Sequence, residues 1–216
     1  MTPDEYRELA REWCEYAVNG DVGRRVDAPV YRWVTEKRDN GPGYSSCADL
    51  GHWLLYRLGI RADYLNRIEH IGWRPVVNVG RLCCRPVGGG ADGAAREPEP
   101  DEVFRTGDIL ICWSRPDTRD AHVMVCAEHL GNTLLTWDYG QGPMSAAAWA
   151  GNRSHVETKR KLRTVHQNDG RWVFDGGRSI RSVLSLEVAI ENARAAGLLA
   201  DPDLPVGEVL DEKIPA

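Results

Sequence analysis

Three residues of this 216-residue chain have the side chains needed for acyl transfer through a thiol: Cys47, His122 and Asp138. A thiolate attacks a carbonyl carbon, an imidazole moves the proton, and a carboxylate fixes the imidazole tautomer and stabilises the imidazolium. Each residue also has a structural interpretation: a small core cysteine, a strand-edge histidine bonded to backbone, and a loop-entry aspartate. Their order along the chain favours the catalytic interpretation.

The segment that begins at Cys47 predicts a mostly buried helix. Ser45 or Ser46 can serve as the N-cap, and Gly59 is a natural stop. Cys47 would then lie in the first helical turn, where unpaired backbone N–H groups and the helix dipole favour a thiolate. The apolar side chains at helical spacing are Cys47, Leu50, Leu54, Leu55 and Leu58.

The segment from Ala121 to Asp138 predicts a β-hairpin. A three-residue loop at 129–131, with Gly131 in the left-handed conformation, would place His122 directly opposite Asp138. Directly opposed side chains lie on the same face of a sheet, so the carboxylate could orient the imidazole. We expect a bulge in this hairpin to shift the register by one residue and spoil the pairing.

These residues resemble a pattern found in the NlpC/P60 and CHAP families of papain-like cysteine peptidases and amidases. The resemblance covers residues 27–142 and implies an α+β fold with a papain-like core, in which the nucleophile-bearing helix packs on a small antiparallel sheet. It also makes Tyr31 and Ser46 candidates for substrate or oxyanion binding, alongside the backbone N–H of Cys47. The matching positions are Pro29, Tyr31, Trp33, Gly43, Cys47, Gly107 to Leu110, His122-Val123 and Asp138.

This pattern is not matched in full. The Asp-Cys-Ser-Gly that is usual in these families is replaced by Ser46-Cys47-Ala48-Asp49, and Trp33 is followed by Val-Thr instead of Gly-Gly. These differences bear more on the substrate than on the fold.

The chain divides into three parts in this interpretation. Residues 1–26 contain an N-terminal helix from Pro3 to Asn19, residues 27–150 form the core with an insertion at 81–102, and residues 151–216 form a C-terminal extension of strands and a helix packed on the same domain.

Composition excludes several classes of protein. A net charge of −5 is not typical of nucleic-acid binding, and no apolar run is long enough to cross a membrane. The acidic N-terminus has no secretory signal, which predicts cytoplasmic synthesis, with phage association or a non-Sec export route as the alternatives for reaching a cell wall. The six cysteines favour reduced thiols, and their spacing predicts neither a metal site nor a cofactor. The oligomeric state is not indicated.

Two function classes follow. The first is a cysteine hydrolase that cleaves an amide bond, with peptidoglycan stem peptides as the substrate that the resemblance implies. The second is a catalytically weak or inactive member of that fold, which serves as a binding or assembly module. A basic run, Lys159 to Arg163, is either a solvated strand face or a contact for a polyanion or cell wall.

Overall fold

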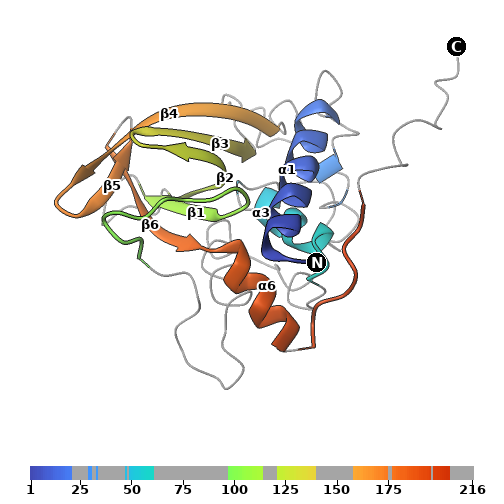
Figure 1. The fold of residues 1–216 in the computed structure, drawn as a ribbon. Helices are drawn as coiled ribbons and strands as arrows, with labels where there is room; N and C mark the ends of the chain where they lie inside the picture. The colour runs from blue at the N-terminus through green and yellow to red at the C-terminus, as the bar shows by residue number, and fades with distance from the viewer. Residues whose placement is uncertain are drawn as a thin grey trace, which may run out of the picture.

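The structure is a computed structural model, and it describes residues 1–20, 29, 30, 33, 47, 49–60, 97–113, 121–139, 158–174, 177–195 and 197–204. Six antiparallel strands close into a barrel in the order β1 to β6, with β1 paired to β6 (Figure 1). The strands are β1 (Ile109–Trp113), β2 (Ala121–Leu130), β3 (Thr133–Tyr139), β4 (Thr158–Asn168), β5 (Arg171–Phe174) and β6 (Arg178–Leu184). The helices with complete bounds are α1 (Pro3–Gly20), α3 (Asp49–Arg57) and α6 (Leu186–Ala195).

The predicted papain-like α+β core on a small antiparallel sheet is wrong. The strands form one closed barrel, and β4 to β6, from the part predicted as a C-terminal extension, are half of its wall. The physical reason is that closure depends on the pairing of β1 with β6, about 70 residues away along the chain. Alternation of apolar residues identifies each strand but carries no information on such distant partners.

Helix α1 begins with a capping box. The Glu5 N–H donates to Thr2 Oγ1 at 3.3 Å, and the Thr2 N–H donates to Glu5 Oε2 at 2.6 Å. One face of α1 is buried, including Trp13 and Cys14. The N-terminal helix predicted from Pro3 to Asn19 is therefore confirmed to within one residue.

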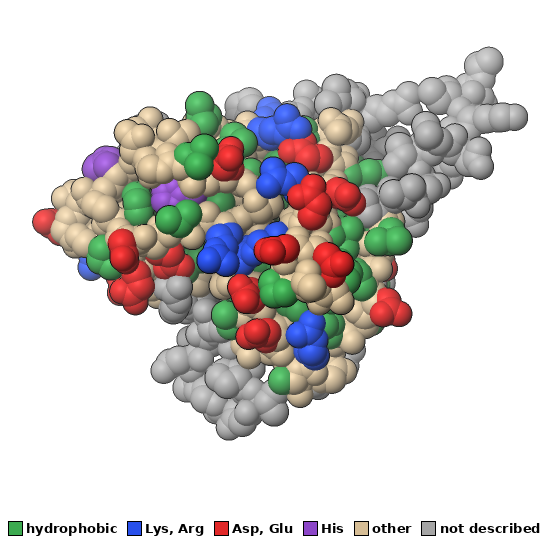
Figure 2. All heavy atoms as spheres, viewed as in Figure 1, with side chains coloured by type: hydrophobic (Ala, Val, Ile, Leu, Met, Phe, Trp, Pro, Cys, Tyr) green, Lys and Arg blue, Asp and Glu red, His purple; other side chains and the backbone are tan. Residues whose placement is uncertain are grey.

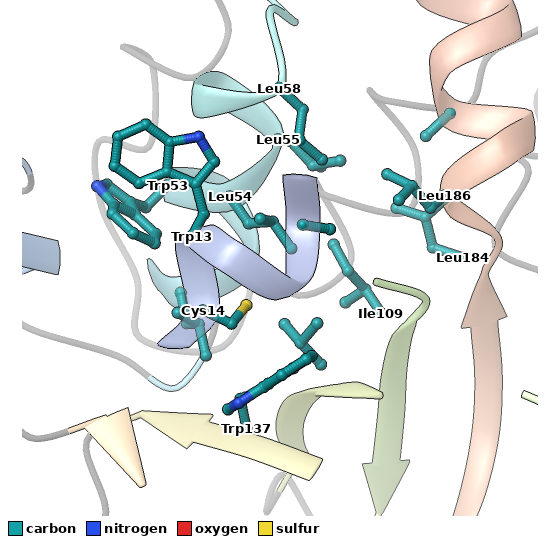
Figure 3. Packing of buried hydrophobic residues seen from close by; sticks show 14 of the residues in the cluster. Trp13, Cys14, Trp53, Leu54, Leu55, Leu58, Ile109, Trp137, Leu184 and Leu186 are labelled. Atoms are coloured by element: carbon teal, nitrogen blue, oxygen red, sulfur yellow. The ribbon is translucent and has the colours of Figure 1, made fainter. Parts of the chain in front are cut away.

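Two apolar clusters stabilise the fold, one on each side of the barrel wall. Figure 3 shows the outer cluster, in which Trp13 of α1 and Trp53 of α3 lie near the strand residues Ile109 and Trp137. The inner cluster fills the barrel with residues from all six strands and from Phe104. Because β1 and β2 contribute alternate residues to both clusters, these strands are buried on both faces.

The Gly107-Asp108 pair joins the barrel to both terminal helices. Gly107 has φ +88°, and a Cβ there would lie 2.6 Å from Leu186 Cδ2. The Asp108 carboxylate accepts hydrogen bonds from the backbone N–H groups of Arg105 and Leu186, at 2.8 and 3.0 Å, and from Arg7 of α1 at 3.1 Å. These contacts indicate an architectural role for the pair.

The face shown in Figure 2 carries acidic and basic side chains interspersed over α1. Ion pairs also join α1 to the barrel, including Arg7 with Asp108 and Glu15 with Arg160. Within the described part of the chain, no helix combines the length and the apolar character of a membrane span.

Candidate active site

Cys47 lies at the N-terminal end of α3, in a turn two residues before the first helical residue, Asp49. It is not inside the first helical turn, where the sequence predicts it. Its side chain is half-buried, and its Sγ accepts a hydrogen bond from the backbone N–H of Val123 at 3.4 Å. The N-terminal end of a helix and an N–H donor both favour negative charge on sulfur.

Helix α3 is held rigidly beneath this turn. Leu50, Leu54, Leu55 and Leu58 are all at most 1% exposed, as the apolar spacing predicts. Gly59 has φ +95°, and the N–H of Ile60 donates to the Leu55 carbonyl at 3.0 Å, which closes the helix end. The nucleophile candidate therefore sits on a well-packed element.

The β2–β3 hairpin brings His122 and Asp138 together, but not in the predicted register. Asp138 pairs with Met124, so His122 is its diagonal neighbour rather than its direct partner. The loop is the two-residue turn at 131–132, not the predicted three-residue loop at 129–131. His122 Nε2 nevertheless lies 2.6 Å from Asp138 Oδ2.

A β-bulge explains why the two side chains still share a face. The pairing shifts between Cys126 and Glu128, which leaves Ala127 as the extra residue in β2. If β2 and β3 paired regularly from the two-residue turn onward, His122 and Asp138 would lie on opposite faces of the sheet, because successive side chains of a strand point to opposite faces. The expectation that a bulge spoils this pairing is wrong, since the bulge is what restores it.

Asp138 is a wholly buried carboxylate with donors at both oxygens. Thr136 Oγ1 donates to Oδ1 at 2.6 Å, and Arg163 donates to Oδ1 at 3.1 Å and to Oδ2 at 2.5 Å. Burial alone would raise the pKa of this carboxyl. The hydrogen bond and charge of His122, the charge of Arg163 and the Thr136 hydroxyl outweigh burial and lower the pKa to about 2. Asp138 is therefore ionised at neutral pH.

His122 is also buried, at 5% exposure, and its ring contacts the Cys47 thiol as well as Asp138. Because Nε2 faces the carboxylate, Nδ1 is the ring nitrogen left for the thiol. Burial acts to lower the pKa of His122, but hydrogen bonds to Asp138 and Cys47 and their negative charge raise it above its usual value. The arrangement stabilises an imidazolium beside the ionised Asp138 carboxylate.

Sequence reasoning missed the residues that surround Asp138. Thr136, Lys161 and Arg163 contact the carboxylate, with Lys161 Nζ 3.7 Å from Oδ2. The sequence did contain a signal for the two basic residues. Side chains alternate between the faces of a strand, so Lys159, Lys161 and Arg163 of the basic run share one face of β4. The Cys112 thiol, which donates to the His122 carbonyl at 3.3 Å, is wholly buried, and burial raises its pKa.

The oxyanion and substrate candidates Tyr31 and Ser46 lie outside the described residues. Among the residues that are described, no group of three or more His, Cys, Asp or Glu side chains is arranged to hold a metal ion.

Comparison with protein-family models, with curated proteins and with solved structures finds no match to this chain. The contacts of Cys47, His122 and Asp138 are thus the basis for assigning a function.

Proposed function

We propose that this protein is a cysteine hydrolase that cleaves an amide bond with Cys47, His122 and Asp138. The observation that carries the proposal is one continuous chain of contacts: thiol to imidazole, and imidazole to a buried, ionised carboxylate at 2.6 Å. A cysteine packed only for structure needs none of these partners.

Acylation begins when the thiol proton passes to His122 Nδ1 and the sulfur attacks the carbonyl carbon of the amide. The Val123 N–H, which donates to Sγ at 3.4 Å, stabilises the thiolate before attack. The imidazolium then protonates the amide nitrogen, the C–N bond breaks, and the amine leaves. The product is a thioester on Cys47.

Deacylation uses the same groups in reverse. His122 takes a proton from a water molecule, the hydroxide attacks the thioester carbonyl, and the C–S bond breaks to release a carboxylic acid. The proton returns to the thiolate. Asp138 stays ionised throughout, because its low pKa makes it an electrostatic partner of the imidazolium and not a proton acceptor.

The proposed substrate is a peptidoglycan stem peptide. This assignment comes from the resemblance to NlpC/P60 and CHAP proteins around the three residues, and it does not depend on the papain-like core, which the barrel replaces. The proposal places the protein among phage-associated or effector-type cell-wall hydrolases.

The test is a digest of purified cell wall, with released fragments identified by mass spectrometry. We expect wild-type protein to release peptides with new amine and carboxyl ends, and Cys47→Ala to reduce turnover to background, because no other described side chain can form the acyl intermediate there. His122→Ala should lower turnover on the order of 1,000-fold, since the thiol then lacks its proton acceptor.

The matched control is His166→Ala, which removes an exposed histidine near the far end of β4. It should digest cell wall like the wild type. Equal digestion by wild type and Cys47→Ala would contradict the proposal, as would an inactive wild type on cell wall and on simple peptide amides.

A further inference from the structure

Two cysteine sulfurs lie on opposite sides of one peptide group of β2, the group that joins His122 to Val123. The Cys112 thiol donates to the His122 carbonyl at 3.3 Å, and the Val123 N–H donates to Cys47 Sγ at 3.4 Å. The C=O and the N–H of a trans peptide group point in opposite directions. This peptide group therefore connects a wholly buried thiol to the nucleophile of the proposed reaction.

The sheet register places both sulfurs. Cys112 of β1 pairs directly with His122, and its side chain belongs to the cluster that fills the barrel. On the other edge of β2, the pairing with β3 reaches only as far as Met124, and Val123 lies one residue beyond it. The N–H of Val123 donates there to Cys47. The end of the pairing with β3 thus leaves a backbone donor for the nucleophile.

Cys112 keeps its proton and can therefore serve as a donor. Its side chain is wholly buried, and burial raises the pKa of the thiol. Negative charge on Asp138 and Cys47 raises that pKa further, and Arg163 and Arg178 oppose the increase without cancelling it. The Cys112 thiol consequently stays protonated under conditions in which Cys47 ionises.

We propose that Cys112 is a positioning residue for the nucleophile: its hydrogen bond to the His122 carbonyl polarises the peptide group and strengthens the bond from the Val123 N–H to the Cys47 thiolate. The C–N bond of a peptide has partial double-bond character, so a donor at the oxygen draws electrons from the nitrogen and makes the N–H a stronger donor. This inference rests on the proposed function, because it concerns the thiolate that attacks the substrate.

The first experiment compares Cys112→Ser with Cys112→Ala. The two new side chains are nearly equal in size, but only serine keeps a donor for the carbonyl. The ratio of thiolate to thiol at Cys47 is obtained from the pH dependence of its alkylation by iodoacetamide, measured by mass spectrometry. Cys112→Ala should lower this ratio about 1.5- to 4-fold, as expected when a hydrogen bond to a charged group loses about 10–30% of its strength. Cys112→Ser should recover most of the wild-type ratio.

A second comparison separates the peptide route from the imidazole, because His122 contacts Cys47 and itself titrates. Cys112→Ser and Cys112→Ala are compared again in a His122→Ala background. That change removes the ring but keeps the carbonyl and the Val123 N–H, so the difference in the thiolate ratio should persist. Loss of the difference would show that Cys112 acts through the ring, and would overturn the peptide route.

Cys14→Ala is the matched control. It removes another wholly buried thiol, from α1 in the outer cluster, and should leave the thiolate ratio at Cys47 unchanged.

The infrared S–H stretching bands test the inference in wild-type protein. Polarisation of the peptide group is mutual, so ionisation of Cys47 should strengthen the Cys112 hydrogen bond and move the Cys112 band to lower frequency. The moving band should be absent from Cys112→Ser. A titration in which some S–H bands disappear but none of the remaining bands moves would overturn the proposal.

The outcomes separate this inference from the proposed function. A Cys47 that reacts faster than the other thiols and slows in His122→Ala, but has the same thiolate ratio in Cys112→Ser and Cys112→Ala, overturns the role of Cys112 alone. A Cys47 no more reactive than the buried thiols overturns both. With hydrolysis in hand, kcat/KM should be lower in Cys112→Ala than in wild type and Cys112→Ser.

Discussion

At the scale of single residues, the decisive feature is a buried carboxylate that is shared among several donors. Asp138 accepts from Thr136 and Arg163 and still lies 2.6 Å from His122 Nε2. A buried anion with fewer partners would take up a proton. Arg163 and Thr136 therefore act as positioning residues: they keep Asp138 ionised and hold one oxygen toward the imidazole.

The corresponding prediction concerns Asp138→Asn. The amide keeps an acceptor near His122 but removes the charge that stabilises imidazolium, so the pKa of His122 should fall and kcat/KM should drop on the order of 100-fold. NMR of the imidazole protons should show wild-type His122 titrating above pH 6.5 and the variant titrating lower.

Asp169→Asn provides the control for that variant. It makes the same chemical change at an exposed turn position, and we expect wild-type activity and an unchanged His122 titration. Full activity of Asp138→Asn would show that another group orients the imidazole.

At the scale of elements, the bulge at Ala127 and the close approach at Gly107 position the site. The bulge turns His122 and Asp138 to the same face and, beyond it, also turns His129 into the barrel. Gly107 allows the segment before β1 to pass against Leu186 of α6 and Ala10 of α1. In both places the backbone departs from regular strand geometry, at Ala127 to orient side chains and at Gly107 to allow close packing against the helices.

Gly107→Ala should destabilise the protein by about 2 to 5 kcal/mol, because the left-handed φ of +88° is strained for alanine and the new Cβ would overlap Leu186. Urea unfolding measures this difference. Gly177→Ala is a matched control, since φ there is +75° but no atom lies within 4 Å of the added Cβ. It should cost about 1 kcal/mol. Equal costs for the two variants would show that the contact with Leu186 is not tight.

At the scale of the whole molecule, the two ends of the barrel are chemically different. The Cys47 end is lined by ionised side chains, whereas Phe104, His129 and Trp172 form an aromatic cluster at the other end, with ring centroids 4.9 to 5.9 Å apart. The His129 ring accepts from the Phe104 N–H at 3.2 Å, and its Nε2 lies 2.9 Å from the Gly131 carbonyl. These two bonds require the neutral imidazole.

The two buried histidines should therefore respond to pH in opposite directions. The pKa of His122 is raised, so its stabilisation is complete below pH 6.5 and is lost as pH rises through the folded-state pKa. Burial lowers the pKa of His129, although the Gly131 carbonyl opposes it. The stabilisation by His129 is complete above pH 6.5 and is lost as pH falls through its folded-state pKa.

Urea unfolding of wild type and variants between pH 5 and 9 measures these effects. His129→Gln should reduce the loss of stability on the acid side, and His122→Gln should reduce the loss on the alkaline side. His166→Gln, at an exposed position, should follow the wild-type curve. If His129→Gln and His122→Gln both reproduce the wild-type pH dependence, neither ring is coupled to folding as its contacts indicate.

The sequence alone determines the local features of this protein. Apolar periodicity and capping residues predict α1 and the buried face of α3, and alternation between turn residues predicts β2, β3 and the strands after them. The same patterns single out Cys47, His122 and Asp138, because a cysteine before a buried helix and a His–Asp pair on one hairpin are visible over short distances along the chain. Each of these signals involves residues close in sequence.

Only the tertiary structure decides the closure of the barrel, the true hairpin register and the surroundings of Asp138. Closure joins β1 to β6, and Arg163 reaches Asp138 from 25 residues further along the chain, so both depend on contacts that no local pattern encodes. The bulge cannot be predicted from the sequence either. Between His122 and Ala127, β2 is apolar on both faces, so the apolar pattern does not decide which side chains point into the barrel. Packing against the barrel interior on one side and the helices on the other selects the orientation of β2 that brings His122 to Asp138.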